Sequence, residues 1–229
     1  MCAHPASWPM TATPSELTHR VIGALATDPR RPGSVRVMVQ GRPLLTIPRE
    51  TAAAEGLAAG TALAEPLYAR LCRAADEEAA YRTVLRFLER RPFAARDLAR
   101  RLVMKGHPPA AAEVAVQRAE RAGLVDDTRF TLNYVETRSA RGRGPLRIRR
   151  DLAALGVARE LVDRTLAEVF PDGAEGLSLL VEPLARKRLA QLRGLPRSAA
   201  RRRLLNFLAR RGFQGTPVQQ LVLRLLGGS

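Results

Sequence analysis

Apolar residues recur at helical spacing through most of the chain. Three segments, DLARRLVMKG (97–106), RIRRDLAALG (147–156) and RRLLNFLARRG (202–212), each place aliphatic residues eight and four positions before a glycine. Residues four apart lie on the same face of a helix, and a glycine just beyond the helix can adopt the left-handed conformation that closes it. The pattern therefore predicts three amphipathic helices, each buried along one stripe and each ended by a glycine.

The three segments correspond position by position, and the correspondence extends into the helix that follows each glycine. The aligned positions are Leu98, Leu102 and Gly106, then Ile148, Leu152 and Gly156, then Leu204, Leu208 and Gly212. Past the glycines, the matching small or apolar pairs are Ala112 and Val116, Val162 and Leu166, and Val218 and Val222. One further helix is expected before each segment, beginning near Glu78, Asp127 and Ala174. Three tandem triplets of helices predict a mainly α repeat protein with the shape of an elongated, curved rod.

The first 76 residues have a different pattern. Residues 17–25 and 34–40 alternate loosely and are rich in β-branched residues, and QGRP (40–43) supplies a turn before the apolar run LLTI. These features predict a small antiparallel sheet. Short helices are expected after it, at about 49–55 and 65–75, with Gly56 and Gly60 as breakers between them.

The predicted domain order follows from this change of pattern. Residues 1–15 contain three prolines and no periodic apolar positions, which is typical of a disordered tail. The predicted segments are that tail, a small α+β module at 16–76, and three-helix repeats at 77–127, 128–172 and 173–229. Pro183 falls inside the first helix expected in the third repeat, so we expect that helix to start or to kink there.

The composition is consistent with packed helices and adds a strong positive charge. Only 4% of the residues are aromatic, so the core must consist mostly of Leu, Val and Ala. The chain holds 38 basic and 22 acidic residues, a net charge of +16, which predicts a polyanionic or acidic partner. The charge is uneven, because residues 173–229 hold 11 basic residues against 2 acidic ones. The placement of the arginines is therefore more informative than their number.

Two basic clusters form the candidate contact surface. In the helix that opens at Pro145, Ile148 and Leu152 occupy the buried face, which leaves the neighbouring arginines facing outward. In the third repeat we interpret Ser198 as the N-cap of a helix that presents a second group of arginines. The candidate contact residues are Arg141, Arg143, Arg147, Arg149 and Arg150, and then Arg186, Lys187, Arg188, Arg193, Arg202, Arg203 and Arg210. Guanidinium forks match phosphate and carboxylate groups, so a nucleic-acid backbone or an acidic protein surface would fit them.

A plain solvated helix face is the alternative interpretation of such clusters, and we adopt it for the first repeat. There, acidic neighbours offset the charges of Arg90, Arg91, Arg96, Arg100, Arg101 and Lys105. Aromatic residues are few, and we assign Phe207 and Phe213 to the core rather than to base stacking. Phosphate contact without sequence preference is then the expected mode of any nucleic-acid binding.

No pattern in the sequence indicates an enzyme, a cofactor or a metal site. Asp126 and Asp127 precede a predicted helix, where an aspartate caps free backbone amides, so we interpret both as caps. The histidines (His4, His19 and His107) and cysteines (Cys2 and Cys72) lack partners at metal-ligand or disulfide spacing. No phosphate-binding loop of the GxxxxGK[ST] type is present. No apolar run reaches the length of a membrane span, so we expect a cytoplasmic protein.

Three stretches carry a resemblance to a known family: FLERRPFAARDLARRLVMKG (87–106), GLVDDTRF (123–130) and RGRGPLRIRRDLAALGV (141–157). They resemble the RecX family, whose members regulate the RecA recombinase. The resemblance covers roughly residue 77 to the end, with the third repeat as the weakest match, and the strand-rich start looks like the N-terminal extension that some members carry. It implies a three-helix repeat protein that lodges in the groove of the RecA filament on DNA and lowers ATP hydrolysis and strand exchange.

We therefore expect a non-enzymatic, monomeric regulator of homologous recombination and DNA repair. Its expected partners are the RecA filament and single- or double-stranded DNA, which it contacts through phosphate groups without any cofactor. Two other functions fit the same charge pattern. One is a sequence-independent DNA-binding module that has no recombinase partner, and the other is an adaptor for an acidic protein.

Overall fold

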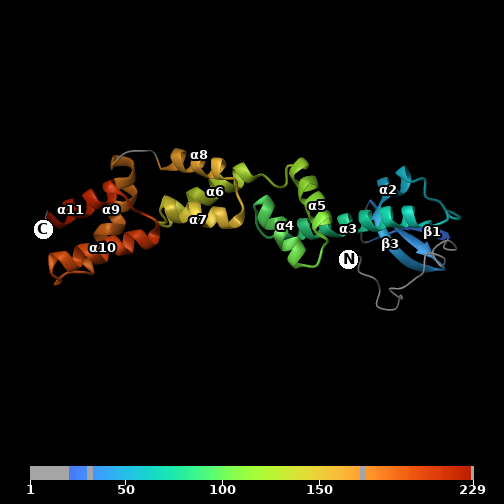
Figure 1. The fold of residues 1–229 in the computed structure, drawn as a ribbon, viewed down its shortest axis with the longest axis horizontal. Helices are drawn as coiled ribbons and strands as arrows, with labels where there is room; N and C mark the ends of the chain where they lie inside the picture. Colours follow the sequence, from blue (N-terminus) through green and yellow to red (C-terminus); the bar gives the residue numbers. More distant parts are fainter. Residues whose placement is uncertain (1–20, 30–32, 171–173, 228–229) are drawn as a thin grey trace. The chain divides into compact units, whose positions relative to one another are not determined.

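The chain folds into two compact units (Figure 1). The computed structural model describes residues 21–29, 33–170 and 174–227, with the backbone alone over 174–179. The first unit comprises the chain up to Pro92 together with Leu98–Val125, and the second comprises Phe93–Asp97 together with the chain from Asp126 onward. The tail expected at residues 1–15 lies outside the described residues.

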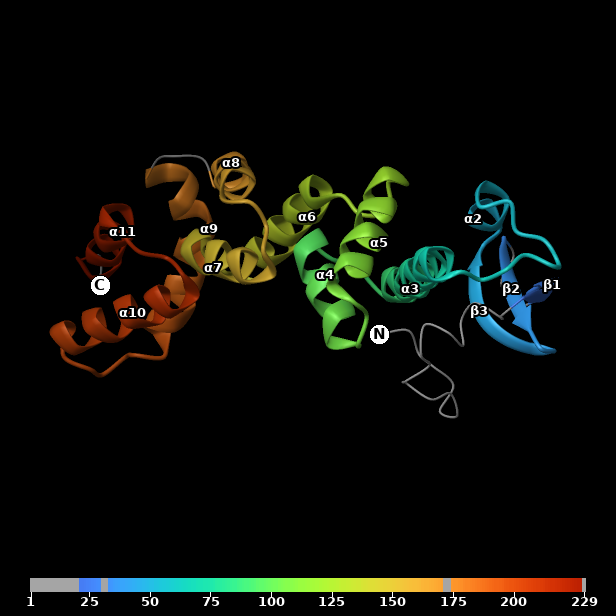
Figure 2. The same ribbon diagram turned by 45° about the vertical axis from the view of Figure 1, so that its right-hand side comes forward.

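A three-stranded antiparallel sheet opens the first unit, as predicted. Its strands β1 (Ile22–Thr27), β2 (Ser34–Val39) and β3 (Arg42–Pro48) are hydrogen-bonded in the order β1-β2-β3, and they lie side by side in Figure 2. Gln40 and Gly41 join β2 to β3 with φ angles of 50° and 73°, which is the backbone that a tight two-residue hairpin requires. Alternate residues of β2 are buried, so one face of the sheet contributes to the core.

Two helices follow the sheet, α2 (Arg49–Ala54) and the long α3 (Glu65–Leu88). The sequence predicted a break within α3, with one helix at 65–75 and another from about residue 78, and this prediction was wrong. The residues around the expected break, RAADEEAA (73–80), contain neither glycine nor proline and are mainly Ala and Glu, which favour a continuous helix. The first half of α3 buries Leu71 against the sheet, and the second half buries Ala80 and Val84 where α3 packs on the first repeat.

Eight further helices in the described part of the chain complete the three predicted triplets. In the first repeat, α3 is followed by α4 (Ala95–Met104) and α5 (Pro109–Arg121). The second repeat contains α6 (Asp127–Ala140), α7 (Pro145–Leu155) and α8 (Arg159–Val169), and the third contains α9 (Ala174–Ala190), α10 (Arg197–Arg211) and α11 (Thr216–Gly227). The mainly helical fold with a strand-containing N-terminal module is confirmed. The five segment boundaries and the rod shape stay predictions.

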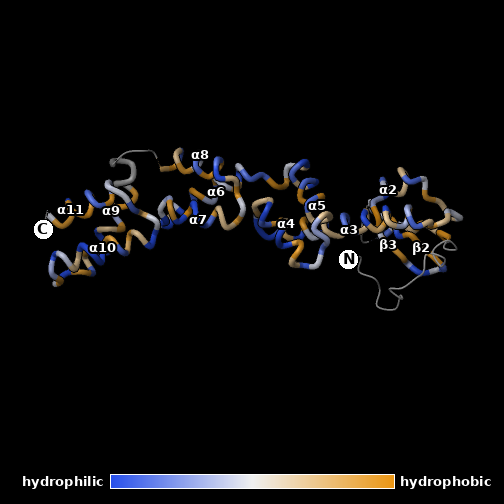
Figure 3. Tube along the Cα trace, viewed as in Figure 1, coloured by the Kyte–Doolittle hydropathy of each residue, from blue (hydrophilic) through white to orange (hydrophobic). Residues whose placement is uncertain are grey.

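The periodic positions are buried as the pattern requires. All six aliphatic residues aligned in α4, α7 and α10 are completely inaccessible to solvent, and their partners in α5, α8 and α11 are also buried. The three aligned glycines have φ angles of 91°, 83° and 92°, so each helix does end in the predicted left-handed residue. Figure 3 shows the resulting alternation of hydrophobic and hydrophilic positions along these helices.

Two predictions for the third repeat concern Pro183 in α9 and Ser198 in α10. Helix α9 runs on both sides of Pro183, so this proline does not start the helix. Ser198 is not the N-cap of α10: that position is Pro196, whose carbonyl accepts a bond from Ala200 N at 2.9 Å. Proline has a fixed φ and its own carbonyl can begin the helical ladder, so the helix starts before Ser198 and leaves that hydroxyl exposed.

Candidate polyanion-binding surface

Three of the five candidate arginines in residues 141–150, which we call the α7 cluster, are paired with carboxylates of the second repeat. Arg143 Nη1 donates to Asp151 Oδ2 at 3.2 Å. Arg147 Nε lies 3.1 Å from Asp151 Oδ1, close enough for an ion pair, although this N–H is not aligned for a hydrogen bond. Arg149 Nε donates to Asp163 Oδ1 at 2.8 Å, and this bond is the main reason that the pKa of Asp163 lies below its ordinary value. The α7 cluster is therefore much less positive than its arginine content suggests.

The other two members of the α7 cluster keep free cationic ends. The side chains of Arg141 and Arg150 are exposed and form no hydrogen bond or ion pair with another described residue. The spacing of Arg147 and Asp151, four residues apart on one helix, was a sequence signal for pairing. The partnership of Arg149 with Asp163 had no such signal, because Asp163 lies on α8.

Helix α10 is the strongest concentration of uncompensated charge among the described residues. It holds six arginines and no acidic residue. Five of them have exposed side chains that form no hydrogen bond or ion pair with another described residue: Arg197, Arg201, Arg202, Arg203 and Arg210. No side chain caps the start of this helix, so the positive end of its dipole adds to the same charge. This surface favours an extended anion.

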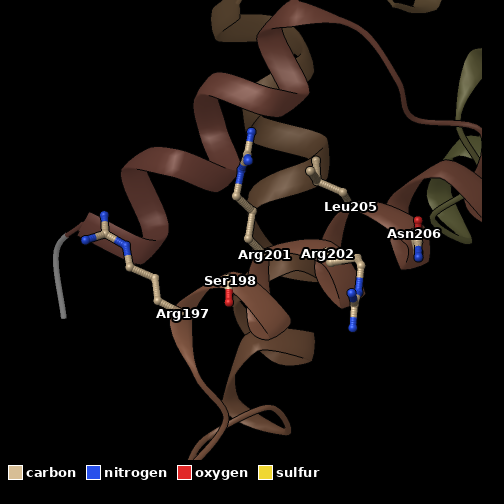
Figure 4. A pocket seen from close by; sticks show the side chains of 6 residues that line it. All are labelled: Arg197, Ser198, Arg201, Arg202, Leu205 and Asn206. Atoms are coloured by element: carbon tan, nitrogen blue, oxygen red, sulfur yellow. The ribbon is translucent and has the colours of Figure 1, made fainter.

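A shallow groove follows the first half of α10. It has a volume of about 590 Å³ and is lined by Arg197, Ser198, Arg201, Arg202, Leu205 and Asn206. Figure 4 shows the side chains of Arg197, Arg201 and Arg202 spaced along the helix with their guanidinium groups pointing in different directions. A single small anion could not contact all three groups together. The spacing suits a chain of negative charges, such as a nucleic-acid backbone or an acidic protein segment.

The candidates on α9 and in the turn after it are partly engaged. Arg186 pairs with Glu182 at 2.7 Å, and Arg188 donates to Gln191 at 2.8 Å. Lys187 and Arg193 are exposed and have no such partner among the described residues.

The two phenylalanines of this region are core residues, as expected. Phe213 is buried. Phe207 packs against the same core, and the guanidinium groups of Arg188 and Arg211 lie 5.5 and 4.7 Å from its ring centre. Because cations already cover its ring, Phe207 is not available as a platform for stacking bases.

A close backbone junction joins the second and third repeats, between the start of α7 and the end of α10. Gly144 N donates to Arg211 O at 2.7 Å, and Leu146 N lies 3.3 Å from Gly212 O. A Cβ atom on Gly144 would lie only 2.5 Å from the carbonyl carbon and oxygen of Gly212. The contact was missed because it joins residues nearly 70 positions apart.

The aspartate pair at the start of α6 has a structural role. Asp126 accepts bonds from Thr128 N at 2.8 Å and Arg129 N at 3.0 Å, which confirms it as the helix cap. Asp127 accepts a bond at 2.8 Å from Ala95 N, so its carboxylate caps the start of α4 instead of its own helix. Both carboxylates are therefore engaged with backbone amides.

In the described part of the chain, no group of three or more His, Cys, Asp or Glu residues is arranged to hold a metal ion. None of its helices is long and apolar enough to cross a membrane.

Comparison with known proteins places these repeats in a family. Residues 80–118 match the family description "RecX, first three-helix domain", and residues 126–166 match "RecX, second three-helix domain". The chain is 34% identical over 143 residues to the regulatory protein RecX of Xanthomonas axonopodis pv. citri, covering 62% of this chain and 85% of that protein. It is 36% identical over 152 residues to the regulatory protein RecX of Halorhodospira halophila, covering 63% of this chain and 87% of that one.

Two solved structures share the fold. A crystal structure of a regulatory protein RecX superposes with a TM-score of 0.73 at 21% identity, covering 92% of this chain and all of the other. RecX from Lactobacillus salivarius superposes with a TM-score of 0.59 at 15% identity, covering 67% of this chain and 98% of the other. At these identities the superpositions establish the fold, while the sequence relatives establish the family. This chain belongs to the RecX family of regulatory proteins.

Proposed function

We propose that this protein is a non-enzymatic regulator that binds the RecA recombinase filament on DNA and inhibits its ATP hydrolysis and strand exchange. It would act in the cytoplasm as a monomer and thereby modulate homologous recombination and DNA repair. Family membership supports regulation of RecA in general. The observation that carries the contact assignment is α10, where five exposed arginines lack a carboxylate partner among the described residues.

The proposed contacts are unequal between the two basic clusters. On α10, Arg202 and Arg203 are exposed and unpaired, so they can bind phosphate or carboxylate groups without first breaking an internal ion pair. In the α7 cluster, Arg143 and Arg147 would have to leave Asp151 before making an equivalent contact. We therefore assign the main contact to α10, with Arg150 as the free contributor from α7.

Inhibition follows if binding favours one state of the filament. A ligand shifts a conformational equilibrium only by the difference between its affinities for the two states. A chain that bridges neighbouring RecA subunits opposes the relative movement of those subunits that ATP turnover and strand exchange need. The fixed junction at Gly144 and Gly212 supports such a role, because it links the α7 and α10 surfaces through their backbones.

The test is ATP turnover by RecA on single-stranded DNA, with increasing amounts of the full chain. The wild-type chain is expected to inhibit turnover, and R202Q/R203Q is expected to require about tenfold more protein, the loss expected when charged contacts are removed. The matched control is R42Q/R49Q, which removes the same charge from exposed residues of the N-terminal module. Absence of inhibition by the wild-type chain at a few-fold excess would refute the proposed function. Equal inhibition by R202Q/R203Q and wild type would refute the assignment to α10.

Direct DNA binding without a recombinase partner is the second candidate, and the unpaired charge of α10 favours it. In that case the chain binds duplex DNA tightly in the absence of RecA. Counterion release then makes the logarithm of affinity fall with the logarithm of salt by about 0.9 per phosphate contacted. Weak binding to free DNA combined with firm binding to preassembled filaments excludes this candidate.

A further inference from the structure

A cleft in the first repeat forms a second basic site, separate from the surface described above. It has a volume of about 740 Å³ and lies between the C-terminal half of α3 and the turn after α4. All of its lining residues belong to the first unit. Its ionisable lining residues are Arg82, Arg86, Glu89, Arg90, Lys105 and His107. We call it the first-repeat cleft.

The hydroxyl of Thr83 organises two cationic side chains in this cleft. Thr83 is buried, and its Oγ1 donates to Ala79 O at 3.1 Å. The same oxygen accepts a bond from Arg86 Nη2 at 3.0 Å and lies 3.0 Å from His107 Nε2. A hydroxyl has one proton and two acceptor lone pairs. Because Thr83 donates its proton to Ala79 O, its oxygen must accept hydrogen bonds from both Arg86 and His107. His107 Nε2 therefore carries a proton, and the guanidinium and imidazole groups are held side by side.

The cleft has more positive than negative charge. Arg82 pairs with Glu78, and Glu78 also accepts a bond from Arg118 at 3.0 Å, so this carboxylate is already shared. The side chains of Arg90 and Lys105 are exposed and form no hydrogen bond or ion pair with another described residue. Among the described residues, Glu89 is the only acidic one that lines the cleft. Arg86, Arg90 and Lys105 thus face a single carboxylate.

The surroundings of His107 are consistent with an anion site. Burial and, after it, the neighbouring Arg86 guanidinium lower the pKa of His107, while Asp76 acts in the opposite direction. A phosphate bound next to Arg86 would offset this repulsion and stabilise the protonated imidazole. Binding should therefore raise the pKa of His107 and strengthen as the pH falls.

We propose that the first-repeat cleft binds the phosphate group of a nucleotide, supplied either as a free nucleotide or as part of a nucleic-acid strand. The volume lies within the range of small-molecule sites. Arginine forks match phosphate geometry, and a lysine adds a mobile point charge. Leu85 and Phe87 give the cleft an apolar portion against which the sugar and base can rest. The site does not depend on the proposed action on RecA.

The experiment follows the imidazole resonances of His107 by NMR in the full chain, with H107Q used to assign them. The probes are inorganic pyrophosphate, ATP and an unlabelled oligothymidylate, each added in a separate titration at several pH values. The variant is R90Q/K105Q, whose two side chains form no hydrogen bond or ion pair with another described residue. The matched control is R42Q/R49Q, which removes the same charge from exposed residues of the N-terminal module. Circular dichroism verifies that both variants are folded.

We expect the probes to move the His107 resonances, to raise its pKa, and to bind R90Q/K105Q about tenfold more weakly than wild type or the control. A response to pyrophosphate and ATP identifies a free-nucleotide site, whereas a response to the oligonucleotide alone identifies a strand as the source. No movement with any probe at about 1 mM, or equal affinity of R90Q/K105Q and wild type, overturns the proposal. Failure to inhibit RecA would leave this result unaffected, so the two proposals fail separately.

Discussion

Replacing Gly144 with alanine tests the junction between the second and third repeats. Gly144 has φ −85° and ψ 165°, an extended conformation that alanine adopts without strain. The obstacles are the backbone of Gly212 and the ring of Phe213, because the added Cβ atom would lie 2.5 Å from both the carbonyl carbon and oxygen of Gly212 and 2.8 Å from Phe213 Cδ1. Two backbone atoms of a closed helix end cannot move aside as a flexible side chain would. The start of α7 must therefore separate from the end of α10.

The expected cost has two sources. Overpacking in a well-packed contact costs about 1–3 kcal/mol. The separation also weakens the bonds from Gly144 N to Arg211 O and from Leu146 N to Gly212 O, and a buried backbone group left without its partner costs about 1–3 kcal/mol. Partial relaxation reduces both contributions. We expect G144A to lower the free energy of unfolding of the second unit by about 2–4 kcal/mol.

Urea unfolding followed by circular dichroism, together with hydrogen exchange of the segment from Gly144 to Ile148, measures this effect. The control is G23A, because Gly23 also lacks a left-handed φ and an added Cβ atom would meet Met38 O at an ordinary 3.7 Å. We expect the control to change stability by less than about 1 kcal/mol. A G144A chain with the midpoint and exchange protection of wild type would show that the close approach does not constrain the repeats.

Three further predictions concern the aspartates of the second repeat. D126A removes the cap of α6, so thermal or urea unfolding should show a loss of about 1 kcal/mol, and an unchanged midpoint would contradict the capping role. D151N removes the carboxylate charge that pairs with Arg143 and Arg147, so filter-binding or fluorescence titrations should show tighter DNA binding whose affinity depends more steeply on salt. An unchanged slope of log affinity against log salt would mean that these arginines do not reach the DNA. The pKa of Asp163 is lowered in the folded chain by Arg149 and Arg159. The ionised carboxylate therefore stabilises the fold at pH values above its unfolded pKa, and this stabilisation is lost as the pH falls through the folded pKa. NMR titration of the carboxylate, assigned with D163N, measures the pKa, and an ordinary or raised value would contradict the prediction.

The helices and their buried faces could be predicted because helical phase is a local property. Leu98, Ile148 and Leu204 each precede a glycine by eight residues, and this spacing alone places them in the core. The continuity of α3 was missed because its first half completes the sheet module while its second half belongs to the first repeat. Helix propensity depends on the residues of the helix itself, so it does not show that two parts of one helix pack against different neighbours.

The sequence predicts only some of the ion pairs that the arginines form. Arg147 and Asp151 are four residues apart on one helix, so their pairing could be recognised from the sequence. Arg149 meets Asp163 only because α7 and α8 pack together, and Asp127 reaches the start of α4 across more than 30 residues. Contacts between helices therefore decide which arginine side chains remain unpaired. The spacing of residues along the sequence does not reveal these contacts.

The two basic helices of the second unit have separate physical tasks. Helix α7 fixes its own start against α10 through Gly144 and distributes its arginines between internal carboxylates and solvent. Helix α10 has no carboxylate of its own, so its charge can be neutralised only by other elements or by a partner. Exposed ion pairs contribute little to stability, about 0–1 kcal/mol each, so the free arginines of α10 are better explained by binding than by folding. Removing charge from α10 should therefore weaken binding to the partner and leave the free energy of unfolding nearly unchanged. The Gly144 substitution should instead lower the free energy of unfolding, and binding should weaken as a consequence.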